Sequence, residues 1–424
     1  MTSALIADLE WRGLIAQTTD REALLKELNG GSTAFYIGFD PTAPSLHVGN
    51  LVVLLVMRRF QLAGHKPLPL VGGATGLVGD PSGKNEERSL NEVEVVEQWV
   101  GRIRNQLSKF LDFESTSNSA VLTNNLDWTK PVTALDFLRD IGKHFSVNQM
   151  LSKDSVSSRL EGGGISYTEF SYQVLQAFDF LELYRRYNCK VQLGGSDQWG
   201  NIVAGLDLIR KVEGATAHCL TIPLLMKSDG TKFGKTAGGS VWLDPEMTSP
   251  YAFFQFWLNS DDADLPNYLK IFSFKSHEEI KNLIASHQAN PGLREAHRSL
   301  ARELTTLVHG AGECEAAERA AKALFGQEDL SLLDERTLES ALLQLPRTTI
   351  SASEPIPTWV ELLAATGVVD SKSAARRIVK EGGAYLNNER VPSEEFAPAS
   401  ENLLFGRFLL LRKGKRDLAA VEVI

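Results

Sequence analysis

The chain has 424 residues, of which 43% are hydrophobic and 23% are charged, and its formal net charge is -9. This composition is typical of a globular protein of two or three domains, and no run of the sequence approaches the roughly 18 apolar residues that a membrane span needs. The negative net charge does not exclude a nucleic-acid partner, because basic residues can gather on one surface.

The N-terminal stretch MTSALIADLEWRGLIAQ carries acidic residues and lacks a long apolar core, so no signal peptide is expected. Strands are predicted at residues 33–39, 66–74, 119–125, 190–196 and 218–225. Helical length and periodicity mark residues 51–64, 90–111, 167–187 and 201–212. This alternation predicts an α/β domain with a parallel sheet covered by helices on both faces, whose ligands lie beyond the carboxyl ends of the strands.

Helical patterns continue from Tyr251 to Gln327, and the proline-rich and Ser/Thr-rich segment 345–358 reads as a linker. The tail after this segment looks like a small separate module. We therefore predict four segments, at residues 1–227, 228–344, 345–358 and 359–424. The 3 cysteines of the chain are widely spaced and form neither a disulfide framework nor a metal pattern, which favours a reducing, cytoplasmic location.

The segment YIGFDPTAPSLHVGN joins the first strand to a strongly apolar helix. Ser45 is expected to cap this helix, and His47 to lie in its first turn, where free backbone N–H groups favour phosphate oxygens. Thr42 and His47 could then donate hydrogen bonds to phosphates, and Gly49 would leave room for a flat ring. The alternative is a helix cap with a half-buried histidine.

Two glycine-containing loops follow. In VGGATGLVGDPSGK the glycine spacing denies the dinucleotide fingerprint, and Asp80, Lys84 and Arg88 remain as charges near a strand end. In SDGTKFGKTAGG the glycines are too close for a phosphate loop of the Walker type, but Lys232 and Lys235 suit a mobile loop that closes on a polyphosphate. A surface turn and a solvated basic loop are the respective alternatives.

The helix predicted at 167–187 places Tyr172, Gln176 and Asp179 on one face, at spacings i, i+4 and i+7. The helix is otherwise apolar, so these groups are expected to line a binding site rather than a solvated stripe. In QLGGSDQWGN, two glycines allow close backbone approach, and Asp197 and Gln198 could bind hydroxyl groups. The alternative there is a simple strand-to-helix turn.

The tail contains two basic stretches that could face RNA phosphates, although a basic surface without that role is equally compatible with them. Their basic residues are Arg376, Arg377, Lys380, Arg412, Lys413, Lys415 and Arg416.

Together these stretches resemble the bacterial tyrosyl-tRNA synthetases, a class I aminoacyl-tRNA synthetase family, over nearly the whole chain. YIGFDPTAPSLHVGN is similar to the HIGH signature and KFGKT to the KMSKS signature of that class. GGATGLVGDPSGK, GKHFSVNQM, YTEFSYQVLQAFDF and QLGGSDQWGNI are typical of the tyrosine branch, and the tail resembles an S4-type RNA-binding domain. One departure is Asn50, which stands where the general signature has a second histidine.

The resemblance implies a Rossmann-like catalytic domain, a helical domain and a small α+β S4-like domain. It also implies that L-tyrosine and ATP, with Mg2+, give tyrosyl-adenylate and pyrophosphate, after which tyrosine passes to the 3′-terminal adenosine of tRNA(Tyr). ATP is a substrate here, and neither a tightly bound cofactor nor a protein metal site is expected. The family further implies a homodimer with GKHFSVNQM near its interface.

The family roles carry over to matching positions of this chain. For tyrosine, the phenol is assigned to Tyr36 and Asp179, and the ammonium to Tyr172, Gln176 and Asp80, with Asn125 supporting them. The ribose and adenylate are assigned to Gly38, Gly194, Asp197, Asp40, Gln198, Gly49 and Asn50. The ATP phosphates and the leaving pyrophosphate are assigned to Thr42, His47, Lys84, Arg88, Lys232 and Lys235.

Two other functions remain as alternatives from the motifs. A small nucleotidyltransferase shares the histidine-containing helix start but has no use for the helical region and the tail. An S4-type RNA-binding protein with a decayed catalytic domain is disfavoured by the intact Thr42, His47, Lys232 and Lys235.

Overall fold

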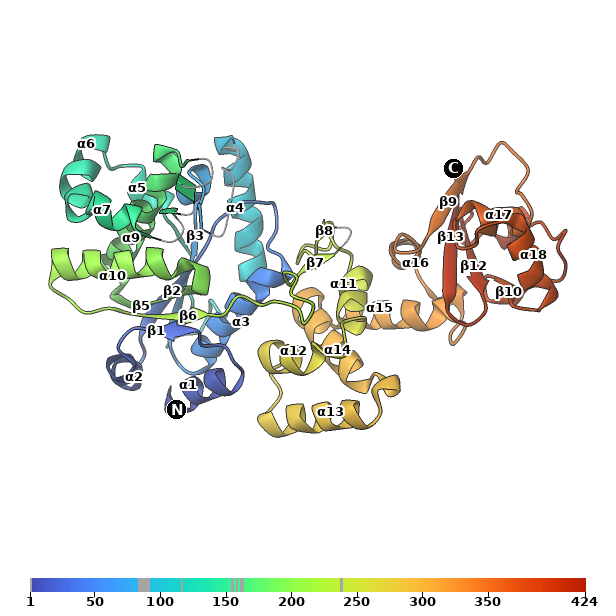
Figure 1. Ribbon diagram of the computed structural model, residues 1–424, viewed down its shortest axis with the longest axis horizontal. Helices are drawn as coiled ribbons and strands as arrows, with labels where there is room; N and C mark the ends of the chain where they lie inside the picture. Colours follow the sequence, from blue (N-terminus) through green and yellow to red (C-terminus); the bar gives the residue numbers. More distant parts are fainter. Residues whose placement is uncertain are drawn as a thin grey trace. The chain divides into compact units, whose positions relative to one another are not determined.

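The computed structural model describes residues 2–82, 92–115, 117–153, 156–157, 159–160, 164–236 and 239–424 (Figure 1). The chain divides into two compact units. The first comprises Met1–Met247 and Asp261–Ala285, and the second comprises Thr248–Ser260 and Ser286–Ile424. Each unit is described below by itself.

The first unit is built on a six-stranded sheet with the order β1-β6-β5-β2-β3-β4. The five strands β2 to β6 pair in parallel, as predicted. The short edge strand β1 pairs antiparallel with β6, and no sequence pattern indicated it. The strands are β1 (Gln17–Thr18), β2 (Ala34–Phe39), β3 (Lys66–Val71), β4 (Thr123–Asn124), β5 (Cys189–Gly195) and β6 (His218–Ile222). A separate hairpin consists of β7 (Lys235–Thr236) and β8 (Gly239–Ser240).

Helices cover both faces of this sheet, which confirms the predicted α/β class (Figure 1). The helices of the first unit are α1 (Thr2–Trp11), α2 (Arg21–Asn29), α3 (Val48–Leu62), α4 (Val93–Leu107), α5 (Leu126–Thr129), α6 (Ala134–Asp136), α7 (Val147–Leu151), α9 (Tyr167–Tyr187), α10 (Trp199–Glu213) and α12 (Leu265–Phe272). The residues of α13 (His277–Ala289) divide between the two units.

Alternation along β2 separates the two faces of the sheet. Phe35 packs against Phe60 of α3, with ring centroids 5.0 Å apart. The next residue, Tyr36, packs against Phe180 of α9 at 5.2 Å and joins the apolar core formed with α9 and α10. The Tyr36 side chain therefore lies on the α9 side of the sheet.

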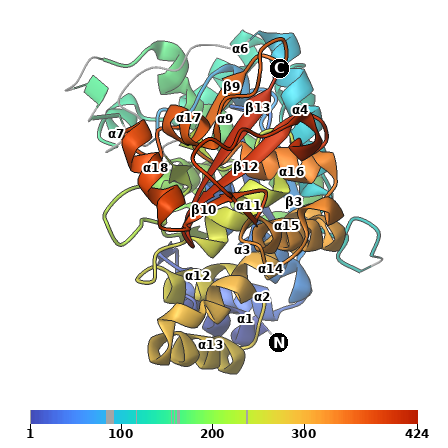
Figure 2. The same ribbon diagram turned by 90° about the vertical axis from the view of Figure 1, so that its right-hand side faces the viewer.

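The second unit combines a helical part with a small sheet domain. The helices of the former are α11 (Pro250–Leu258), α14 (Glu295–His309), α15 (Ala311–Leu324) and α16 (Glu335–Leu342). The sheet has the order β11-β10-β12-β13-β9. Its strands are β9 (Arg347–Ile350), β10 (Ala384–Leu386), β11 (Glu389–Arg390), β12 (Phe408–Lys413) and β13 (Asp417–Val423). The helices α17 (Trp359–Ala365) and α18 (Lys372–Lys380) pack on this sheet around the buried Trp359 (Figure 2).

The segment 345–358, interpreted above as a linker, contains a strand. β9 pairs in parallel with β13, so the sheet domain begins at about residue 346. Arg407 of this domain also forms ion pairs with Glu335 and Glu339 of α16, at 3.3 Å each. The helical part and the sheet domain are therefore less independent of each other than the composition of segment 345–358 indicates.

All three cysteines, Cys189, Cys219 and Cys314, are buried free thiols. Within the described ranges, no helix has the length and apolar character needed to cross a bilayer.

Candidate active site

The start of α3 is organised by His47. The helix begins at Val48, with His47 as its N-cap, and the Nδ1 atom of His47 accepts a hydrogen bond from the backbone N–H of Asn50 at 3.3 Å. The Asn50 side chain in turn accepts one from the backbone N–H of His47 at 3.1 Å. The expectation that Ser45 caps this helix is wrong, because its hydroxyl bonds instead with Leu46, Gln106 and Asp244.

This capping arrangement explains why glycine stands at position 49 and asparagine at position 50. A methyl group on Gly49 would lie 2.7 Å from Cε1 of the His47 ring, so the glycine leaves room for the imidazole itself. Asn50, which departs from the general signature, completes the capping box. Because Nδ1 of His47 accepts a hydrogen bond, a neutral ring carries its proton on Nε2.

Asp179 forms the centre of a buried cluster beneath the strand ends. Its carboxylate accepts hydrogen bonds from Asn125 Nδ2 at 3.0 Å and from Trp128 Nε1 at 2.8 Å. Burial raises the pKa of Asp179 to about 7, although both hydrogen bonds oppose that shift. The Tyr36 hydroxyl is buried and forms no hydrogen bond with any described residue, and its pKa is raised well above the usual value by burial and by the charge of Asp179.

Sequence reasoning missed Trp128 and Thr75, which hold the predicted residues in place. The Thr75 hydroxyl donates to Asp40 at 2.6 Å and accepts from Asn125 at 2.9 Å. Asn125 thus reaches Asp179 and Thr75, although the resemblance groups it with the ammonium ligands. The only signal in the sequence was that Trp128 and Thr75 follow predicted strands.

Tyr172, the first residue of the polar face of α9, interacts with the carboxylates of Asp40 and Asp80. Tyr172 donates a hydrogen bond to Asp40 at 2.7 Å, and the charges of Asp40, Asp80 and Asp179 all raise its pKa in addition to burial. Asp80 accepts a hydrogen bond from Gln198 at 2.7 Å. This concentration of carboxylates favours a bound cation.

Two other predicted residues lie in the same region. The Oε1 atom of Gln176, one turn along α9 from Tyr172, is buried and unpaired among the described residues. The pKa of Asp197 is raised by burial and by Asp80, and it is partly lowered by the positive charge of Lys232.

The sheet aligns the two predicted glycines. Tyr36 of β2 pairs with Gln192 of β5 in parallel register, so Gly38 and Gly194 each lie two residues further along, at the carboxyl ends of neighbouring strands. A substrate could approach the Gly38 backbone closely, since a methyl group there would meet nothing within 4 Å.

The KFGKT segment lies against the first turn of α3. Gly234 has a φ of +81°, and a methyl group there would lie 2.8 Å from Val48 Cγ2. The backbone N–H of Val48 donates to Val241 beyond the loop at 2.9 Å. The structure thus brings this loop next to the first turn of α3, which His47 caps. The side chain of Lys235 lies outside the described part of the chain, as do Lys84 and Arg88.

The predicted RNA-contacting residues occupy α18 and the β12–β13 turn. Arg376 and Lys380 share Glu394 as an ion-pair partner, at 3.8 and 3.2 Å. Lys413 pairs with Asp417 at 2.9 Å, and the Arg412 guanidinium lies 3.9 Å from the Tyr385 ring centroid. The side chains of Arg377, Lys415 and Arg416 are exposed.

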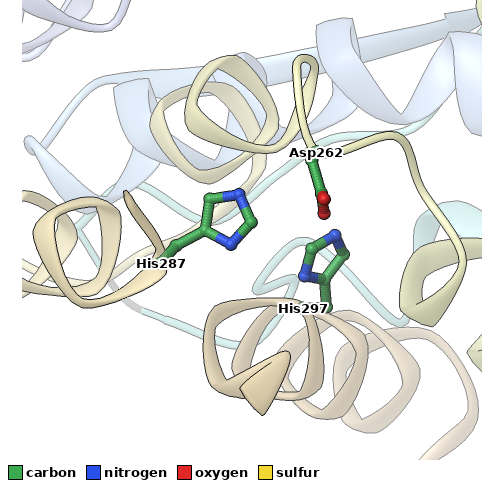
Figure 3. A group of neighbouring side chains, drawn as sticks. All are labelled: Asp262, His287 and His297. Atoms are coloured by element: carbon green, nitrogen blue, oxygen red, sulfur yellow. The ribbon is translucent and has the colours of Figure 1, made fainter. Parts of the chain in front are cut away.

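A histidine pair lies in the second unit, in a place that no sequence motif indicated. The rings of His287 and His297 are 5.2 Å apart and both side chains are buried (Figure 3). His297 Nε2 lies 3.1 Å from the Ser260 carbonyl oxygen. Asp262, also drawn in Figure 3, belongs to the first unit. Two histidines are fewer than the ligands of a protein zinc site, so the pair does not by itself indicate a metal.

The chain is similar to known proteins along its whole length. A family profile described as "tRNA synthetases class I (W and Y)" matches residues 28–326, and one described as "Tyrosine--tRNA ligase SYY-like C-terminal domain" matches residues 337–421. The tyrosine–tRNA ligase of Streptomyces coelicolor is 59% identical over 99% of each chain. That of Thermobifida fusca is 56% identical and covers 98% of this chain and 99% of its own.

Solved structures agree with these relatives. A C-terminally truncated mitochondrial tyrosyl-tRNA synthetase of Aspergillus nidulans has a TM-score of 0.69 and 31% identity, and the match covers 76% of this chain and 94% of that one. The tyrosyl-tRNA synthetase of Archaeoglobus fulgidus, at 15% identity and a TM-score of 0.55, covers 73% of this chain and 99% of its own, and it shares the fold.

Proposed function

This chain belongs to the class I tRNA synthetases, and we propose that it activates L-tyrosine with ATP and transfers the tyrosyl group to the 3′-terminal adenosine of tRNA(Tyr). The observation that carries the proposal is the polar face of α9 together with Tyr36. Tyr172 and Gln176 lie one turn apart, and Asp179 lies one turn further on, beside Tyr36. One helix can thus contact both ends of a tyrosine molecule.

The phenol end is recognised by hydrogen bonding. A buried hydroxyl on Tyr36 and a carboxylate on Asp179 offer one donor and several acceptor positions to a substrate hydroxyl. Asn125 and Trp128 fix the orientation of that carboxylate. Phenylalanine would leave these buried groups unpaired, and this is the basis of its rejection.

The ammonium end is recognised by charge. Tyr172, Gln176 and Asp80 supply its ligands in this proposal, and the surrounding carboxylates stabilise the positive charge. Gly38, Gly194 and Asp197 contact the ribose, while Asp40, Gln198, Gly49 and Asn50 surround the adenylate. These residues lie at the carboxyl ends of β2 and β5 or in the segments that follow them, where an α/β sheet binds its ligands.

Catalysis consists of positioning and charge stabilisation, without a covalent enzyme intermediate. The tyrosine carboxylate attacks the α-phosphorus in line, and the bond to pyrophosphate breaks. His47 Nε2–H and the Thr42 hydroxyl donate hydrogen bonds to the phosphates, aided by the N-terminus of α3. Lys84, Arg88, Lys232 and Lys235 neutralise the leaving pyrophosphate. Mg2+ enters with ATP as part of the substrate complex.

Binding of tRNA is assigned in part to the C-terminal sheet domain. The residues proposed to contact phosphates are Arg376, Arg377, Lys380, Arg412, Lys413, Lys415 and Arg416. Their local positive charge lets an acidic protein bind RNA. Glu394 and Asp417 hold three of these cations at fixed positions on the surface.

A homodimer is part of the proposal, and exposed apolar side chains support it. Leu135, Leu138 and Val147 are 79%, 54% and 59% exposed, and they flank or belong to the GKHFSVNQM region. Clustered apolar exposure of this kind marks protein–protein interfaces. Sedimentation velocity should detect a dimer, and Val147→Glu should shift it toward monomer. A wild-type monomer at micromolar concentration would contradict this assignment. A cytoplasmic location completes the proposal and accords with the free thiols.

The direct test of the proposed function is aminoacylation. The protein should attach labelled tyrosine, but not phenylalanine or tryptophan, to bacterial tRNA(Tyr) transcripts in the presence of ATP and Mg2+. Failure to charge tRNA(Tyr) by a folded protein that still forms adenylate would overturn the transfer step alone. Charging of a tryptophan tRNA instead would overturn the substrate assignment.

A further inference from the structure

The base of the KFGKT loop is anchored to α12. Asp264, at the start of this helix and 6% exposed, accepts a hydrogen bond from the backbone N–H of Ser228 at 2.7 Å. Its other carboxylate oxygen accepts one from the Tyr268 hydroxyl at 3.2 Å. Both partners lie within the first unit, so one buried carboxylate connects the entry of the loop to the helix beside it.

Phe233, inside the KFGKT signature, anchors the same loop by its side chain. Its ring is 8% exposed and packs edge-on against Tyr268, with centroids 5.2 Å apart, and against Phe272 at 5.4 Å. The backbone N–H of Phe233 also donates to the Leu225 carbonyl. The aromatic ring is therefore held by two side chains of α12.

The packing of Phe233 against α12 constrains the position of the neighbouring residue Lys232. Lys232 forms an antiparallel bridge with Met226, so its own backbone is extended, and the chain then turns at Phe233 and Gly234. The Phe233 ring is buried against α12 while the Lys232 side chain stays exposed, and the positive charge of Lys232 opposes the rise in the pKa of Asp197. On the other side of the anchor, Gly234 contacts Val48 in the first turn of α3.

We propose that Phe233, Asp264 and Tyr268 are positioning residues for adenylate formation, which hold the KFGKT backbone so that the Lys232 ammonium faces the nucleotide. None of the three is among the residues assigned above to the substrates. The inference rests on the proposed function and deepens it, because it assigns to α12 the task of orienting a pyrophosphate-binding lysine. A displacement of about 1 Å at a reacting group can cost about 100-fold in rate, so loosening this anchor should affect chemistry.

The test compares Phe233→Leu with Phe110→Leu. Phe110 is 1% exposed, lies in the same unit and follows α4, and its carbonyl oxygen accepts a hydrogen bond from Arg58. Its substitution therefore removes a buried ring that is not part of the anchor formed by Phe233, Asp264 and Tyr268. Stopped-flow measurement should show adenylate formation slowed about 10- to 100-fold in Phe233→Leu, with the dissociation constant of tyrosine within about twofold of wild type. Phe110→Leu should keep both values near wild type.

Tyr268→Phe provides a second variant that keeps the ring and removes only the hydroxyl bonded to Asp264. It should slow adenylate formation several-fold and leave tyrosine binding unchanged. The inference is overturned if adenylate formation in both Phe233→Leu and Tyr268→Phe stays within twofold of wild type, or if Phe110→Leu slows it equally. Absence of tyrosine-dependent adenylate formation in the wild type would instead overturn the proposed function, so the two failures are distinguishable.

Discussion

Replacing Tyr36 by phenylalanine should stabilise the free protein and impair substrate selection at the same time. The side chain is 1% exposed, and its hydroxyl bonds with none of the described residues. An unpaired buried polar group costs about 1–3 kcal/mol. Tyr36→Phe should therefore raise the free energy of unfolding by about 1 kcal/mol, at the lower end of that range. The phenol of bound tyrosine supplies the missing partner, so tyrosine binding should weaken by about 1–2 kcal/mol, or about 5- to 30-fold.

Phenylalanine has no hydroxyl to lose, so its activation should not weaken. Pyrophosphate exchange with each amino acid would give the two kcat/KM values, and urea unfolding would give the stability. Tyr251→Phe is a matched control, because Tyr251 is also buried but belongs to the second unit. If the tyrosine-to-phenylalanine ratio of kcat/KM in Tyr36→Phe stays within twofold of wild type, the phenol assignment is refuted.

Three further predictions concern other parts of the chain. Burial raises the pKa of Asp179 to about 7, against about 3.9 in an unfolded chain, so the folded state retains a proton that the unfolded state loses and stability falls as pH rises from about 4 to about 7. Asp179→Asn should flatten this decline in urea unfolding, and an unchanged slope would argue against a buried neutral carboxyl. Lys232→Ala should slow adenylate formation about 10²–10³-fold without weakening tyrosine binding, and a loss under threefold would exclude a catalytic role. A chain ending at Leu345 should exchange pyrophosphate normally but charge tRNA poorly and with a shallower salt dependence, by a slope of about 0.7–0.9 per lost phosphate contact. Full charging by that chain would show that the sheet domain is not an RNA contact.

Most of the catalytic fold was predictable because its strands and helices have strong periodicity. The helix predicted at 167–187 matches α9 at both ends, and Ser166 is its N-cap. The sequence analysis missed two short strands, β1 and β9, for a physical reason. β1 and β9 contain two and four residues, too few for a periodic signal, and they exist because β6 and β13 offer them an edge.

The sequence predicted the relative placement of polar side chains where they share one helix face, and it missed neighbours that only tertiary contacts bring together. The spacing of Tyr172, Gln176 and Asp179 was sufficient to place them together. No local pattern shows that Trp128 donates to Asp179, because the two residues meet only after the sheet has formed. The cap of α3 was wrongly assigned to Ser45, because histidine is an uncommon capping residue and its neighbour Asn50 completes the arrangement.

The central claim is that one buried site binds both the phenol and the ammonium group of tyrosine and positions the amino acid for reaction with ATP. The most direct measurement is ATP–pyrophosphate exchange by the full chain with tyrosine, phenylalanine and tryptophan supplied separately. The structure predicts rapid exchange with tyrosine, which Asp179→Ala abolishes, and almost none with the other two amino acids. Exchange that is independent of the amino acid, or equal for tyrosine and phenylalanine, would contradict it.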